Sequence, residues 1–153
     1  MRQTQSPVTD RVREGRVKQN RSTAPLDIVV PFTTPKQTEV ALRAAQRLGA
    51  GLDSAVRVVK VQVVPFPLDL RNSPVPVDFL EAQLRNLCGD DVSREIRFAR
   101  EYEDGLRGVL RFRSMVVLAT QKRPWKTRTE RLAASLRSAG HTVVMVPEEK
   151  TNA

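Results

Sequence analysis

Short apolar runs alternate with amphipathic segments along most of this chain, and the runs have the length of β-strands. Five runs are rich in Val, Ile and Leu, at residues 27–32, 55–64, 92–100, 114–120 and 142–146. Runs without polar alternation, such as 114–120, are typical of strands buried on both faces. In the third run Val92, Ile96 and Phe98 alternate with arginines, which indicates a half-exposed strand at or near a sheet edge.

The segments between these runs have helical periodicity and recognisable helix ends. Thr34, Pro35 and Gln37 have the spacing of an N-cap, a first-turn proline and a capping-box partner, and Thr127 with Glu130 forms a second capping box. We expect helices over about 35–48, 76–88, 101–110 and 128–139. Gly49 and Gly51 are expected to end the first helix.

Several side chains within these elements bear on the packing. Phe79 and Cys88 fall on the expected inward stripe of the second helix, where Cys88 is more simply a small buried hydrophobe than a reactive thiol. Arg57, Lys60 and Gln62 interrupt the second strand and suggest partial exposure near one end or on one face. Gly105 and Gly108 each weaken the third helix by about 1 kcal/mol relative to alanine, and they indicate either close packing or a poorly determined helix.

Strands and helices therefore alternate from the first run to the last. Because each crossover between parallel strands brings a helix back over the sheet, the pattern predicts an α/β fold with an open five-stranded parallel sheet and helices on both faces. We expect one domain over residues 25–148, preceded by a disordered basic tail (1–24) and followed by a short C-terminal tail (149–153).

The net charge of +9 is concentrated in two places. Residues 1–24 carry six Arg or Lys against two acids, and residues 121–131 carry five against one. This distribution indicates an anionic partner at the tail and at the loop after the fourth strand, although a merely solvated basic surface is the alternative. The tail could also act as an electrostatic arm for nucleic acid or an acidic membrane surface, of which we do not favour nucleic acid.

The order of these motifs resembles the universal stress protein family, a nucleotide-binding branch of the Rossmann-like α/β folds, over about residues 26–147. The segment Ile28–Leu42 is similar to the family's first strand and helix, Met115–Thr120 to its fourth strand, Thr129–Leu132 to part of its last helix, and Thr142–Pro147 to its final strand. The resemblance implies the strand order 3-2-1-4-5, which would place the helix starts at Thr34 and Thr127 on one cleft.

The ligand motifs depart from those of family members that bind ATP. Thr33 stands where they carry an aspartate, Ala119 and Lys122 stand where the first two loop glycines would be, and Lys126-Thr127 stands where Gly-Ser/Thr would be. We therefore predict a degenerate cleft in which side-chain charge replaces the glycine cradle. ATP or another phosphate-bearing molecule is the expected ligand, bound by Thr33, Thr34, Ala119, Lys122, Arg123, Lys126 and Thr127.

Trp125 and His141 are each the only residue of their kind. The Trp125 ring could stack on a base or shield the cleft, or it could close the core or join a subunit contact. His141 follows a helix-ending glycine, which favours a capping or surface role over acid/base chemistry. Acidic residues near the third strand's end, Glu101, Glu103 and Asp104, already have a structural role at a helix start.

No nucleophile elbow, P-loop or metal-ligand spacing is present, so we expect a protein that is not an enzyme. The expected function is that of a universal-stress-type regulatory domain, dimeric through its last strand. The alternative is a docking module that binds a protein partner, such as a transporter, or an acidic surface through its basic tail and loop. No run approaches the roughly 18 apolar residues that span a bilayer, so we expect a cytoplasmic protein without membrane insertion.

Overall fold

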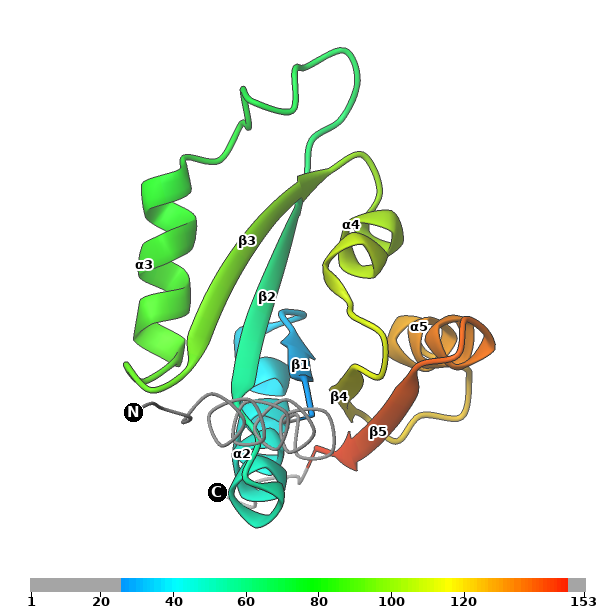
Figure 1. Ribbon diagram of the computed structural model, residues 1–153. Helices are drawn as coiled ribbons and strands as arrows, with labels where there is room; N and C mark the ends of the chain where they lie inside the picture. The colour runs from blue at the N-terminus through cyan, green and yellow to red at the C-terminus, as the bar shows by residue number, and fades with distance from the viewer. Residues whose placement is uncertain (1–25, 149–153) are drawn as a thin grey trace, which may run out of the picture.

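The computed structural model of the protein describes residues 26–148 (Figure 1). The expected tails at 1–24 and 149–153 lie outside these described residues. Strands and helices alternate in the order β1 (Ile28–Pro31), α2 (Pro35–Leu52), β2 (Val56–Val63), α3 (Val77–Leu87), β3 (Ser93–Ala99), α4 (Tyr102–Val109), β4 (Met115–Thr120), α5 (Arg128–Ser138) and β5 (Thr142–Pro147). All neighbouring strands are parallel and follow the order β3-β2-β1-β4-β5, which confirms the predicted sheet.

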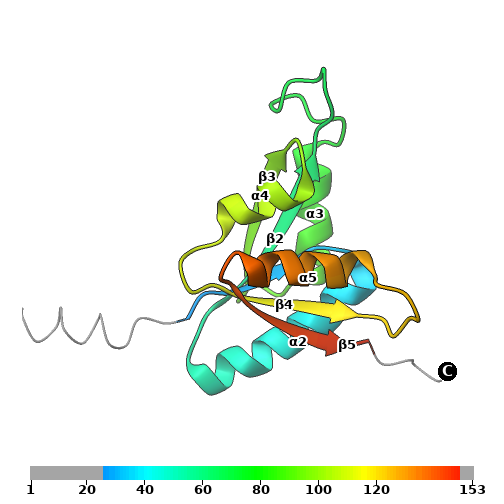
Figure 2. The ribbon, with the colours of Figure 1, turned by 90° about the vertical axis from the view of Figure 1, so that its right-hand side faces the viewer.

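Helices cover both faces of the sheet, and each face has its own core. Ile28 and Val30 of β1 pack in the core under α2 and α3, whereas Val29 packs in the core under α4 and α5. This division follows from the alternation of side chains along a strand. Figure 2 shows α2 and α5 on opposite sides of β4 and β5. No helix in the described part of the chain has both the length and the apolar character that a membrane crossing requires.

The first helix is longer than expected. It continues through Gly49 and Gly51 to Leu52 and is closed by Asp53, which has a left-handed conformation with a φ of 50°. The predicted end at the glycines was wrong because Gly49 serves packing: a Cβ atom there would lie 2.6 Å from the carbonyl oxygen of Ser54. The missing side chain lets the helix lie close to the entry into β2.

Phe79 and Arg57 also differ from expectation. Phe79 is 60% exposed, because α3 contacts the sheet through Leu80, Leu84 and Cys88, a stripe with a spacing of four residues. Arg57 is only 8% exposed, and its Nε and Nη2 donate to the two carboxylate oxygens of Asp27 at 2.9 Å each.

The Arg57 interactions tie together the amino ends of several strands. Its Nη1 donates to Glu95 Oε2 at 2.8 Å, and the Ser114 hydroxyl donates to Asp27 Oδ2 at 2.6 Å. Burial alone would raise the pKa of Asp27, but the hydrogen bonds from Arg57 and Ser114 outweigh burial and hold this pKa below its ordinary value. A charged network therefore closes the edge of the sheet at which β1, β2, β3 and β4 begin.

The two glycines of α4 permit a matched test of packing. A Cβ atom on Gly105 would lie 2.6 Å from Val61 Cγ1 and 2.8 Å from Ala99 Cβ, so this glycine marks close packing of α4 on the sheet. At Gly108 the nearest atom would be the tip of the flexible Arg97 side chain, at 3.3 Å. We expect Gly105→Ala to lower the free energy of unfolding by about 1–3 kcal/mol through overpacking.

In contrast, Gly108→Ala should raise the free energy of unfolding by up to about 1 kcal/mol through helix propensity. Urea denaturation of both variants and of the unchanged protein measures the two effects. Stabilisation by both substitutions would contradict the close contact between α4 and β2.

Candidate functional site

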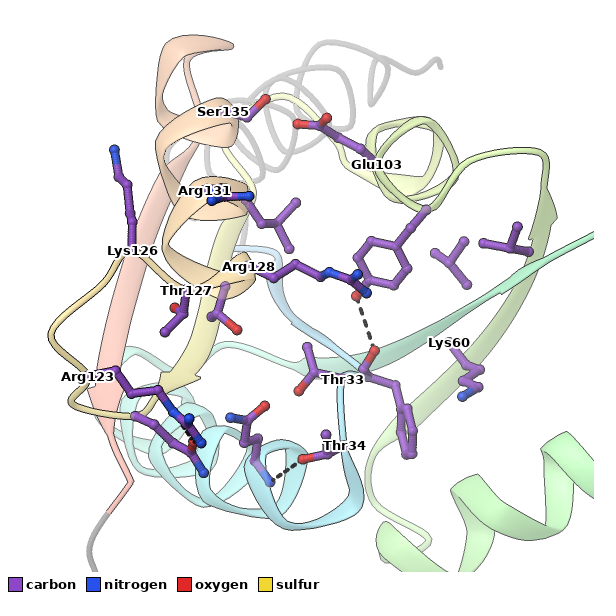
Figure 3. A pocket seen from close by; sticks show the side chains of 18 of the residues that line it. Thr33, Thr34, Lys60, Glu103, Arg123, Lys126, Thr127, Arg128, Arg131 and Ser135 are labelled. Atoms are coloured by element: carbon purple, nitrogen blue, oxygen red, sulfur yellow. Dashed lines mark hydrogen bonds between the residues drawn. The ribbon is translucent and has the colours of Figure 1, made fainter.

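A cleft of about 870 Å³ opens at the carboxyl ends of the strands. Its walls come from the segments after β1 and β4, from the end of β2, and from the beginnings of α4 and α5. The lining residues are Phe32, Thr33, Thr34, Gln37, Lys60, Val61, Val63, Tyr102, Glu103, Gln121, Arg123, Trp125, Lys126, Thr127, Arg128, Thr129, Arg131, Leu132 and Ser135. Most of them are drawn in Figure 3.

Two helices begin at this cleft, as the sequence predicted. The Thr34 hydroxyl accepts from the N–H of Gln37 at 3.2 Å, and the Thr127 hydroxyl accepts from the N–H of Glu130 at 3.2 Å. Glu130 Oε2 accepts from the N–H of Thr127 at 3.2 Å, which completes the capping box. The two hydroxyls are thus engaged by their own helices, and the positive ends of two helix dipoles face the cleft.

A carboxylate already lies at the start of α2. Glu148 Oε1 is 3.2 Å from the Lys36 amine, and the Glu148 side chain is only 5% exposed. Burial would raise the pKa of Glu148, but hydrogen bonds from Lys36 and Gln121 lower it below the ordinary value. The start of α2 therefore has an anion of its own, so the start of α5 is the better place for an external one.

The charged side chains of the cleft are predominantly cationic. Five lining residues are basic, Lys60, Arg123, Lys126, Arg128 and Arg131, and one is acidic, Glu103. Glu103 pairs with Arg107 at 3.4 Å, and within residues 26–148 no acidic side chain lies within 4.0 Å of any of the five cations. Figure 3 shows Arg128 reaching into the cleft toward Thr33, while Lys126 points away from it. The cleft is therefore suited to an anion.

Lys60 and Tyr102 form the end of the cleft that the sequence prediction missed. The Lys60 amine lies 4.0 Å from the centroid of the Phe32 ring, and burial lowers the pKa of this amine. The Tyr102 hydroxyl donates to the carbonyl oxygen of Phe32 at 3.1 Å. The lysine within a valine-rich strand was the signal available for this end of the cleft; nothing in the sequence identified Tyr102.

Trp125 lies on the rim of the cleft rather than in the core. It is 62% exposed, and the Arg123 guanidinium is 5.8 Å from the centroid of its ring. Arg123 is held in turn by Gln121, whose Oε1 accepts from Arg123 Nε and Nη2 at 3.1 and 2.8 Å. This position excludes the interpretation that Trp125 closes the core, and it leaves three others: stacking on a ligand, shielding of the cleft, or a subunit contact.

The structure brings together five of the seven residues that were predicted to bind the ligand: Thr33, Thr34, Arg123, Lys126 and Thr127. Ala119 is 4% exposed and packs in the core beneath α2, because its side chain points to that face of the sheet. Lys122 is exposed on the loop but does not line the cleft.

His141 immediately precedes β5 and therefore lies at the amino end of that strand, opposite the cleft. Within residues 26–148, no three His, Cys, Asp or Glu side chains are grouped so that they could hold a metal ion.

Neither protein-family models nor curated protein sequences match this chain. Solved structures do match. One of them is a universal stress protein in complex with cAMP, similar over 82% of this chain and 98% of that chain, with a TM-score of 0.49 and 12% sequence identity. At this score and identity, the similarity does not assign a ligand, and the fold is defined by the strand order described above.

Tyr102 is the only tyrosine of the chain, so its ionisation can be followed directly. Burial raises the pKa of Tyr102 to about 12, from 10.0 for a free phenol. We expect ultraviolet absorbance to show tyrosinate forming at about pH 12 in the folded protein and near pH 10 in denaturant. Above pH 10.0 the phenol ionises in the unfolded chain but stays neutral in the folded protein, so the free energy of unfolding falls as the pH rises from 10.0 to about 12. Ionisation of the folded protein near pH 10 would contradict the described packing.

Proposed function

We propose that the chain is a non-catalytic regulatory domain of the universal stress type, which binds a phosphate-bearing ligand of the nucleotide class in the cleft. The observation that carries this proposal is the excess of cationic side chains around the start of α5, without acidic partners among the described residues. Phosphate is bound both by helix N-termini and by Arg and Lys side chains. The cleft has room for a nucleotide, since ligand pockets typically measure about 300–1,000 Å³.

Charge takes the role that backbone amides have in glycine-rich loops. The loop over residues 121–127 contains no glycine, so its backbone has less freedom to wrap closely around a phosphate. Arg123 and Arg128 can instead donate several hydrogen bonds to one phosphate. Binding of this kind depends strongly on ionic strength and tolerates different phosphate geometries.

The composition of the lining supports binding without turnover. It contains no histidine and no cysteine, and its one acid, Glu103, is directed to Arg107. General acid/base catalysis most often uses a histidine or a carboxylate that is free to exchange a proton, and the one carboxylate of the described lining is engaged by Arg107. We therefore assign the ligand a regulatory role, in which occupancy of the cleft is the signal.

Calorimetry tests the proposed function. The full-length protein is titrated with ATP, AMP, a cyclic dinucleotide and inorganic polyphosphate at two salt concentrations. We expect at least one of them to bind, with lower affinity at higher salt. Arg128→Gln should weaken that binding by about tenfold, the typical effect of losing a charge-assisted hydrogen bond. Arg47→Gln, on the exposed surface of α2 outside the cleft, is the matched control and should leave binding unchanged. Absence of heat with all four ligands would overturn the proposed function.

The proposed assembly is a homodimer through β5. Among the described residues this strand pairs with β4 on one side and with no strand on the other, and its side chains Val144, Met145 and Val146 are just partly buried in the monomer. A second copy of the strand could extend the sheet across the open edge. Sedimentation equilibrium should give twice the chain mass of 17.2 kDa. A mass of one chain across the micromolar range would refute this assembly.

A further inference from the structure

Lys60 lies at the opposite side of the cleft from the cationic loop that follows β4. Strand β1 separates β2, which carries Lys60, from β4, which leads into the loop, so the backbones of β2 and β4 are about two strand spacings, or about 10 Å, apart. Pro31 pairs with Val59, and Val29 pairs with Val116, so Lys60 is level with Phe32 and close to the level at which the loop begins. The cleft thus has one cation on one side and a group of cations on the other.

The surroundings of Lys60 leave its charge without a protein partner in the described part of the chain. No acidic side chain among residues 26–148 lies within ion-pair distance, and burial disfavours the charged amine. The Phe32 ring at 4.0 Å stabilises the charge only in part. An anionic group on a ligand would supply the missing partner.

The residues between the two cationic regions are mostly uncharged. Phe32, Thr33, Val61 and Tyr102 line this part of the cleft, and Figure 3 shows Thr33 between Lys60 and the Arg123 side. Apolar and hydroxyl-bearing walls suit an uncharged body such as a nucleoside. Uncharged residues therefore lie between Lys60 and Arg123, and Arg128 reaches toward this uncharged wall from the start of α5.

We propose that the ligand carries two phosphate groups separated by a nucleoside body, a proposal that rests on the function proposed above. One phosphate faces Lys60, and the other faces Arg128 and its neighbours. A linear diphosphate places its two charges side by side and cannot reach both regions equally well. A nucleoside bisphosphate has one phosphate on each side of the ribose and fits the separation.

Two isomeric probes test whether affinity depends on the positions of the phosphates or only on the number of phosphates. Adenosine 3′,5′-bisphosphate and adenosine 5′-diphosphate contain the same atoms, but only the first separates its phosphates. Calorimetry on the full-length protein should show at least tenfold tighter binding of the bisphosphate. Lys60→Met should abolish this preference by weakening the bisphosphate about tenfold while changing the diphosphate less than twofold.

Two control variants accompany this experiment. Lys60→Arg retains the charge and should retain the preference. Lys122→Met removes the same charge from the loop outside the cleft lining and should leave the preference unchanged. Thermal melts establish that each variant is folded, and the comparison of the two isomers on the unchanged protein decides the question even if a variant does not fold.

The outcomes separate the two proposals. Equal affinity for the isomers, or equal weakening of both by Lys60→Met, would overturn the two-phosphate ligand and leave a single-phosphate site at α5 intact. Absence of binding for both isomers, together with absence of heat in the four-ligand titration, would overturn the proposed function itself.

Discussion

The site depends on one topological constraint, the reversal of direction in the sheet between β1 and β4. From β1 the chain builds outward through β2 to β3, and it then returns to the other side of β1 to add β4 and β5. Because parallel crossovers have one hand, α2 and α5 leave neighbouring strands toward opposite faces. Neither helix covers the point at which they diverge, and this leaves the cleft open there. Ligands of open α/β sheets generally bind at such reversals.

The amino ends of the strands are built in the opposite way. Arg57 joins Asp27 before β1, Glu95 in β3 and the carbonyl oxygen of Val109 at the end of α4, and Asp27 also accepts from Ser114 before β4. Removing one partner of a buried ion pair typically costs about 3–5 kcal/mol, so the network holds the positions of the strands firmly. This holds although replacing the whole pair by apolar residues is often neutral for stability. One edge of the sheet is thus closed by paired charges, while the other is open and has cations without acidic partners among residues 26–148.

The difference between what the sequence could and could not predict follows from the range of the interactions. Capping boxes and apolar runs are local signals, so the sequence correctly predicted the strands and the helix starts at Thr34 and Thr127. The order of the strands in the sheet came from the family resemblance. Arg57 was misjudged because its partner Asp27, just before β1, lies 30 residues away in the sequence, which no local pattern shows. Lys60 and Tyr102 were missed as cleft residues because they lie inside secondary structure, where the pattern indicated only partial exposure for Lys60 and a packing face for Tyr102. Ala119 and Lys122 were included through their alignment with glycines, and neither side chain reaches the cleft.

The two helix starts at the cleft are not electrostatically equivalent, and this difference decides how the site can be selective. Glu148 already places a carboxylate at the start of α2, whereas the start of α5 is surrounded by Arg128, Arg131 and Arg123. Cationic side chains on flexible stems can adjust their position to a phosphate, unlike a backbone cradle that is fixed to one phosphate geometry. Without glycines in the loop, discrimination between anions must come from where the cations stand relative to one another. The spacing of charges across β1 is therefore the feature on which the proposed discrimination between phosphorylated molecules depends.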